Sequence, residues 1–171
     1  MTFYKIIPNS DKFYSVKSLD KSLNDFQNKF YEVNLKQKWK PLKASFIKKG
    51  ICGDFASLIG FVVCTQKSFI ALSPLVSDEI EFLELLVDTH KYYILNVIRK
   101  VPLDIEKSKF VNSSSGRIIM IDQYAFKDSD IKDMHIFNIE GVLSEGPLVS
   151  QKFKDLVEKN NLEGLIFKKI C

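Results

Sequence analysis

The apolar residues of this chain fall into short runs that favour strands over long helices. The runs are rich in β-branched and aromatic side chains, which pack well on a pleated surface. Turn residues separate them, such as Pro8 after the first run and Gly116 before a later one. Strands are expected at Phe3 to Ile7, Ile59 to Cys64, Tyr92 to Val101, Ile118 to Ile121, His135 to Ile139 and Leu165 to Phe167.

Helical spacing is confined to a few shorter segments. Apolar residues from Leu19 to Leu35 approach a helical period, and Asp54 to Leu58 is compatible with one helical turn. Lys36 to Pro41 then has the composition of an exposed linker. A helix is also expected after Thr65, whose hydroxyl can cap it, with Pro74 ending it after about two turns.

The C-terminal run is the most legible part of the chain. Ser150 is expected to cap a helix, and Asn160 with Asn161 offers an exit from it, because Asn tolerates left-handed backbone geometry. Thr65-Gln66-Lys67 before a strand at Ile80 is similar to Ser150-Gln151-Lys152 before a strand at Leu165. This weak internal repeat is either a duplicated unit or two instances of one capping chemistry. The expected fold class is α+β, with a mainly antiparallel sheet and short helices.

Composition places the chain among globular proteins. Its 171 residues include 14 Phe and 6 Tyr and are 46% hydrophobic, which suits one domain with a sizeable core. The apolar runs fall short of the roughly 20 residues of a membrane-spanning helix, and the N-terminus does not have the pattern of a signal peptide. We therefore expect a cytoplasmic protein. Three scattered cysteines predict free thiols, with Cys64 buried.

Charge is unevenly distributed along the chain. The formal net charge is +4, but the segment from Lys29 to Gly50 alone carries +6. One acidic stretch contains Asp78, Glu79, Glu81, Glu84 and Asp88, and a second contains Asp122, Asp128, Asp130 and Asp133. Such asymmetry either steers a charged partner or forms a solvated lysine-rich face.

The sequence contains no recognisable motif for catalysis or cofactor binding. His90 and His135 lack a second ligand at helical spacing, and the Asp128 stretch lacks the glycine and glutamate of a calcium loop. Ser113 to Gly116 is not a nucleophile elbow but has the composition of a loop, and no glycine pattern indicates a phosphate-binding loop. We expect no catalytic residue, no metal and no cofactor.

The sole tryptophan lies between lysines in Lys36-Gln37-Lys38-Trp39-Lys40-Pro41. Lysines that bind phosphates beside an indole that stacks on bases are typical of single-stranded nucleic-acid surfaces. A Trp next to a Pro more often anchors a linker against the core. A nucleic-acid-binding module using Lys36 to Lys49 is therefore the alternative function that we retain.

From residue 50 onward, short motifs follow one another in a recognisable order. Their order and spacing carry the signal: Gly53-Asp54-Phe55, Thr65-Gln66-Lys67, Ile80-Glu81-Phe82, Tyr92 to Val97, Asp104 with Ser108, Phe137, Leu148-Val149-Ser150 and Leu162 to Phe167. In this order they resemble the bacterial immunity proteins of polymorphic toxin systems, the immunity family numbered eleven. The likeness covers roughly residues 50–170, so residues 51–171 would form an immunity-like core and residues 1–50 an N-terminal lobe within a single domain.

The resemblance implies a function in competition between bacteria. A member of this family would bind a cognate toxin domain in the cytoplasm and neutralise it by steric inhibition, with no turnover of its own. Tight recognition draws on aromatic and charged anchors. The candidate contacts are Lys38, Trp39 and Lys40 or, for a basic toxin, Asp78, Glu79, Glu81 and Glu84. The sequence does not choose between these two surfaces.

Overall fold

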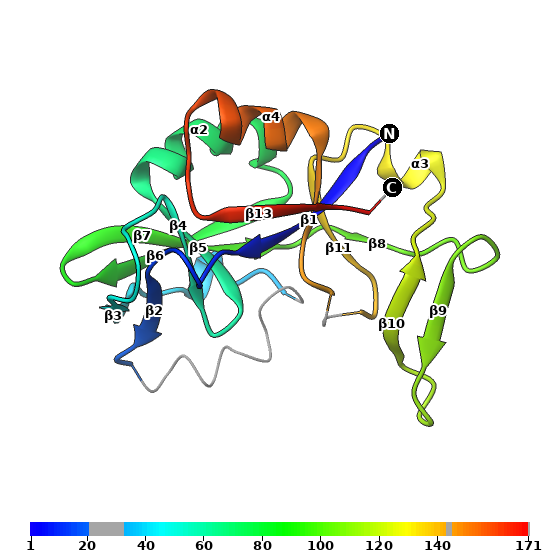
Figure 1. Ribbon diagram of the computed structural model, residues 1–171, viewed down its shortest axis with the longest axis horizontal. Helices are drawn as coiled ribbons and strands as arrows, with labels where there is room; N and C mark the ends of the chain where they lie inside the picture. Colours follow the sequence, from blue (N-terminus) through cyan, green and yellow to red (C-terminus); the bar gives the residue numbers. More distant parts are fainter. Residues whose placement is uncertain (21–32, 143–144, 171) are drawn as a thin grey trace.

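The computed structural model describes residues 1–20, 33–142 and 145–170. Its strands form a closed six-stranded barrel, a five-stranded sheet and a two-stranded hairpin (Figure 1). Most strand pairs are antiparallel, and the helices are short. The predicted α+β class, with a mainly antiparallel arrangement and short helices, is therefore confirmed.

The barrel is built around one long antiparallel pair. Its strands, in spatial order, are β2 (Ser15–Ser18), β3 (Leu42–Ile47), β6 (Ile80–Val87), β7 (His90–Val97), β5 (Phe61–Thr65) and β4 (Phe55–Leu58). Strands β6 and β7 pair along their full length through a turn in which Asp88 and Thr89 have φ of 45° and 75°. This left-handed pair matches the twist of a tight hairpin. A parallel bridge between Val16 and Leu58 closes the barrel.

The five-stranded sheet is buried on both faces at its strands β11 and β12. Its spatial order is β13 (Leu165–Lys169), β1 (Phe3–Pro8), β12 (Leu148–Ser150), β11 (Ile136–Ile139) and β8 (Lys100–Val101). Because side chains alternate along a strand, Ile136 and Val149 enter the core that the barrel shares, whereas Phe137 and Leu148 enter a second core. The sheet thus separates two hydrophobic cores.

Two capped helices lie side by side over the strands, α2 (Gln66–Val76) and α4 (Gln151–Lys159) (Figure 1). As predicted, the Thr65 hydroxyl accepts the Ser68 amide and the Ser150 hydroxyl accepts the Phe153 amide. The prediction that Pro74 ends the first helix is wrong, since α2 continues to Val76. In the last turn Pro74 removes a single intrahelical hydrogen bond, and the helix tolerates that loss.

The internal repeat predicted from sequence corresponds to two units of the same topology. In the first unit, helix α2 connects β5 to β6, and the antiparallel strand β7 lies between these two strands. In the second unit, helix α4 connects β12 to β13, and the antiparallel strand β1 lies between them. The two caps also share their backbone geometry, with φ and ψ of −70° and 166° at Thr65 and −73° and 166° at Ser150. Each unit is a split β-α-β motif.

Three other expectations have different outcomes. The predicted helical turn at Asp54 to Leu58 is strand β4, whose Phe55, Ala56 and Leu58 are all buried. The single strand predicted from Tyr92 to Val101 is two strands, because the chain leaves the barrel after Val97 and joins the other sheet at Lys100. The helix predicted from Leu19 to Leu35 falls mostly on residues 21–32, outside the described part of the chain.

A hairpin and a short helix lie at one end of the molecule (Figure 1). Strands β9 (Lys109–Asn112) and β10 (Ile118–Gln123) form a hairpin, and Ser113 to Gly116 is its turn, as the loop prediction required. A short helix, α3 (Asp128–Ile131), follows and buries Ile131 in the second core.

Candidate partner-binding surface

The predicted tryptophan and lysine contacts lie on a segment that runs along β6. We call residues 33–41 the lysine strap. It contains the single 3-10 turn η1 (Lys36–Lys38) and leads into β3, which pairs with the second half of β6 from Leu85 onward. The strap therefore covers the first half of the same edge of β6. Proteins commonly cover the unpaired backbone groups of an edge strand in this way.

A buried carboxylate fastens the start of the strap. Oxygen atoms of Glu81 accept the backbone N–H of Leu35 at 2.6 Å and that of Lys36 at 3.2 Å. The Asn96 amide, opposite Glu81 on β7, donates both to Glu81 at 2.9 Å and to the Val33 carbonyl at 3.1 Å. Leu35 is buried in the barrel core. This end of the strap is therefore part of the folded interior.

Trp39 fastens the other end. Its indole Nε1–H donates to the Glu84 carbonyl at 2.8 Å, and the half-buried ring packs against the barrel core. Lys36, Lys38 and Lys40 remain exposed between and beside these anchors. Within the described ranges, none of the three forms an ion pair with a carboxylate.

The predicted acidic surface is not a single exposed patch. Glu79 and Glu81 are 6% and 8% exposed, so half of the predicted acidic contacts point inward. Asp78 is exposed, and Glu84 is half-buried in an ion pair with Lys91 at 2.6 Å. Only Asp78 and Glu84, of these four, remain accessible to a partner.

Glu79 has the same chemistry as Glu81 but holds a different segment. Its carboxylate accepts the His135 amide at 2.9 Å and the Ile136 amide at 2.8 Å, at the start of β11. Burial raises the pKa of the Glu79 carboxyl, while these two amides and the charges of His135 and Arg99 oppose that shift. Glu79 thus connects the barrel to the five-stranded sheet.

The signal for the role of Glu81 was present in the sequence. Alternation along β6 places Glu81 on the same face as Leu83 and Leu85, which fill the barrel. A carboxylate on that face must find hydrogen-bond donors, because an unpaired buried charge is costly. Reading the charges as a surface stretch missed this periodicity.

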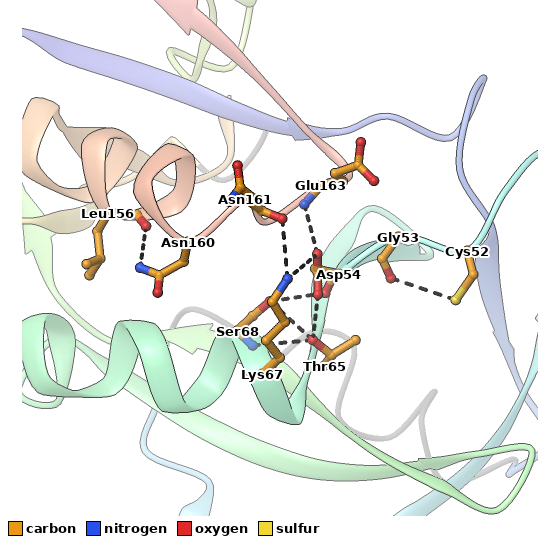
Figure 2. Close-up of polar contacts among 10 residues, drawn as sticks. All are labelled: Cys52, Gly53, Asp54, Thr65, Lys67, Ser68, Leu156, Asn160, Asn161 and Glu163. Carbon is orange, nitrogen blue, oxygen red and sulfur yellow. Dashed lines mark hydrogen bonds and ion pairs between the residues drawn. The ribbon is translucent and has the colours of Figure 1, made fainter.

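A polar cluster around Asp54 joins the two split β-α-β units (Figure 2). The Asp54 carboxylate accepts the Glu163 amide at 3.0 Å and lies 3.5 Å from the Lys67 ammonium group. Lys67 in turn donates to the Asn161 carbonyl at 3.3 Å, and the Thr65 hydroxyl donates to Asp54 at 3.4 Å. The cluster ties the start of α2 to the exit of α4, so its polar groups support the fold.

Ser150 and His135 line a pocket of about 280 Å³ with Met1, Thr2, Phe3, Asp133, Met134, Gln151 and Lys152. The His135 Nδ1 atom lies 3.2 Å from the Ser150 hydroxyl oxygen. That oxygen also caps α4, and the nearby Glu79 carboxylate bonds to the backbone of His135 and not to its ring. The three residues therefore lack the relay geometry of a serine nucleophile with its base and carboxylate.

The cysteine thiols and the possible metal ligands show no sign of a reactive or metal-binding site among the described residues. Cys64 is fully buried as predicted, and burial raises the pKa of its thiol, which keeps it protonated. Cys52 is exposed and unpaired, and Cys171 is outside the described residues. Across the described part of the chain, no three His, Cys, Asp or Glu side chains gather as metal ligands.

The β9–β10 hairpin carries an exposed apolar face that the sequence analysis did not single out. Val111, Ile119 and Met120 are 40%, 57% and 50% exposed, whereas Phe110 and Ile121 on the hairpin contact the second core. Register shifts interrupt the ladder around Ile119 and Asp122.

Comparison with known proteins gives the family. No helix among the described residues has the length and apolar character needed to cross a bilayer. A search of curated proteins found no match. A family model, described as the immunity protein family (Imm11), matches residues 79–171, just over half of the chain. The predicted resemblance is thus confirmed over β6 to the C-terminus, and the chain belongs to the immunity protein family Imm11.

Proposed function

We propose that this protein binds a cognate bacterial toxin domain and neutralises it by physically covering the toxin's active site. The family match over residues 79–171 carries this proposal, because immunity is the property that names the family. We place the protein in the cytoplasm of the toxin-producing cell, where it would meet the toxin before or after delivery from a neighbour.

The packing of the chain supports inhibition by a rigid body. Polar groups suited to chemistry, such as Glu79, Glu81 and the Ser150 hydroxyl, are engaged in holding backbone amides. A binder that acts as an obstacle needs a firm scaffold and a complementary surface, and it needs no reactive group. We therefore propose no turnover by this chain.

We further propose that residues 1–171 act as one unit. The family-matched residues supply β6 and β7, whereas β2, β3, β4 and β5 of the same barrel precede the match. Because the barrel core draws on both parts, separating them would expose Leu83 and Ile94 to water. Truncation at residue 78 is expected to abolish folding of the barrel.

The experiment first identifies a toxin domain encoded next to the gene of this protein and then pairs the two proteins. Cells that express the toxin domain should stop growing, and co-expression of this chain should restore growth. A tagged chain should also retain the toxin domain through purification in a fixed ratio. Growth arrest that persists at high levels of folded protein, with no complex recovered, would refute the proposal.

A further inference from the structure

We propose that the lysine strap is a pre-organised docking surface for an acidic patch on the partner protein, with Glu81 and Asn96 as the positioning residues that hold it. This inference rests on the proposed function, since it names the surface and the chemistry of the partner. Three steps lead to it: the charge of the strap, its anchoring, and the placement of Trp39.

The strap carries a concentrated positive charge. Residues 33–41 contain Lys36, Lys38 and Lys40 and no acidic residue, and the exposed Lys43 follows on β3. For the described residues, no carboxylate forms an ion pair with these four ammonium groups. Complementary potentials speed the encounter of two proteins and select against partners of like charge. An acidic protein surface is the complement of this one.

The strap is anchored before any partner arrives. Glu81 and Asn96 together make four hydrogen bonds in this region, to Leu35, to Lys36, to Val33 and to each other. The Trp39 indole holds the far end. Ordering a loop at the moment of binding costs affinity, so a segment already fixed by the fold avoids most of that cost. The backbone that carries the strap lysines is therefore held in one conformation before a partner binds.

The placement of Trp39 favours a protein over a single-stranded nucleic acid. Stacking on bases requires an exposed aromatic face. The Trp39 ring packs against the barrel core, and its only N–H donates to the Glu84 carbonyl. The half-buried ring therefore offers less of its face to a base than an exposed indole would, whereas the exposed lysines keep their full charge. Trp39 acts as an anchor of the strap.

The positioning role of Glu81 follows from its burial. At 8% exposure its carboxylate is out of reach of a partner, yet it fixes the two backbone amides that begin the η1 turn. Replacing it with Gln keeps the size of the side chain and one acceptor oxygen but removes the charge. The strap should then loosen while the rest of the barrel remains folded.

The test measures association of purified chain with the adjacent toxin domain by surface plasmon resonance at several salt concentrations. Lys38→Glu with Lys40→Glu should slow association about 10-fold or more and flatten its salt dependence, since steering depends on these charges. The matched control, Lys152→Glu with Lys169→Glu, makes the same charge change at exposed sites elsewhere and should stay within about 2-fold of wild type. Equal loss in both double variants would overturn the proposal.

Glu81→Gln tests positioning separately. We expect association about 3-fold to 10-fold slower than wild type, as ordering costs return at binding. Hydrogen exchange should be faster at the Leu35 and Lys36 amides and unchanged at the β6–β7 pairing. A merely structural role would lower the melting temperature and leave the association rate of the folded protein as in wild type, which would overturn the positioning role.

Two further outcomes separate this inference from the proposed function. If wild-type chain does not bind the toxin domain at all, the proposed function fails. If wild type binds and the Lys38→Glu with Lys40→Glu variant binds equally well, this inference alone fails. Binding of a 20-nucleotide single-stranded DNA or RNA that the same charge reversal abolishes, with toxin binding unaffected, would assign the strap to nucleic acid and overturn it as well.

Discussion

Glu79 and Glu81 are two residues apart and perform the same chemistry on two different regions of the molecule. Each carboxylate is buried and accepts two successive backbone amides from a segment that is distant in sequence. Glu79 holds the start of β11, inside the family-matched part, and Glu81 holds the start of the lysine strap, outside it. The hydrogen bonds of Glu79 join the barrel to the five-stranded sheet, whereas those of Glu81 hold an exposed segment in place.

The two carboxylates come from one acidic stretch, but the loss of each should have a different structural consequence. The Glu79 contact fixes the start of β11, whose Ile136 and Phe137 enter the two different hydrophobic cores, so the packing of both cores depends on it. The Glu81 contact fixes a segment whose outer side is exposed, so loss of it should be felt first at the surface. Replacing each carboxylate in turn should separate a contact that secures the whole fold from one that secures a local shape.

The largest effect is expected from Glu79→Ala. Two charge-assisted hydrogen bonds would be lost and the amides of His135 and Ile136 would be left without their acceptor, which should lower the free energy of unfolding by about 3–5 kcal/mol. Urea denaturation followed by circular dichroism measures it. Asp78→Ala, at the exposed neighbour, is the matched control and should change stability by less than about 0.5 kcal/mol. Similar losses in both variants would contradict the account.

Glu81→Ala should cost less and act locally. We expect a loss of about 2–3 kcal/mol, because the strap amides regain water when the strap detaches. Hydrogen exchange should show lost protection at Leu35 and Lys36, with β11 protected as in wild type. Equal loss of protection at Ile136 would mean that the two contacts are not separable.

Trp39→Phe tests how much the indole hydrogen bond to Glu84 contributes to holding the second end of the lysine strap. The substitution keeps an aromatic ring but removes the donor to the Glu84 carbonyl, so stability should fall by about 1 kcal/mol. Thermal unfolding measures this loss. A change of several kcal/mol would show that ring packing, and not the hydrogen bond, is the main contribution of Trp39.

The smallest effect is a pH dependence that belongs to Glu79. Because burial raises its pKa above the ordinary value of 4.5, the folded protein keeps this proton to higher pH than the unfolded chain does. The stability that the proton contributes is complete below pH 4.5 and is lost as the pH rises through the folded-state pKa.

Glu79→Gln, which cannot ionise at this position, isolates that contribution. Between pH 4 and pH 7 the stability of wild type relative to Glu79→Gln should fall as the pH rises. Urea titrations of both proteins across this range measure the difference. A relative gain for wild type as the pH rises would contradict the raised pKa.

Local chemistry made part of this fold predictable from the sequence. The caps at Thr65 and Ser150 depend on side chains within three residues, and most strands are marked by their own β-branched runs. Tyr92 to Val101 was predicted as one strand because the change of sheet after Val97 depends on partners far along the chain. The same holds for β4, four residues long, which becomes a strand only through pairing with β2 and β5.

Only the amino-acid composition of the candidate site could be predicted from the sequence, and not its anchoring. Lys38, Trp39 and Lys40 could be singled out as a basic segment with an aromatic residue, but the anchoring by Glu81 and Asn96 joins residues 46 and 63 positions apart. The run of acidic residues predicts surface charge, although the alternation of β6 places Glu81 inward. The exposed hairpin residue Ile119 gave no signal, because its exposure depends on the packing of the hairpin.

Titration of toxin activity distinguishes a protein that acts as a stoichiometric obstacle from one that turns over. A fixed amount of toxin domain is mixed with increasing amounts of purified chain, and the remaining activity is measured over time. The account predicts a decline that reaches zero near one equivalent and does not progress on longer incubation. Inactivation that continues with time at a small fraction of one equivalent would mean that the chain turns over, and would contradict the account.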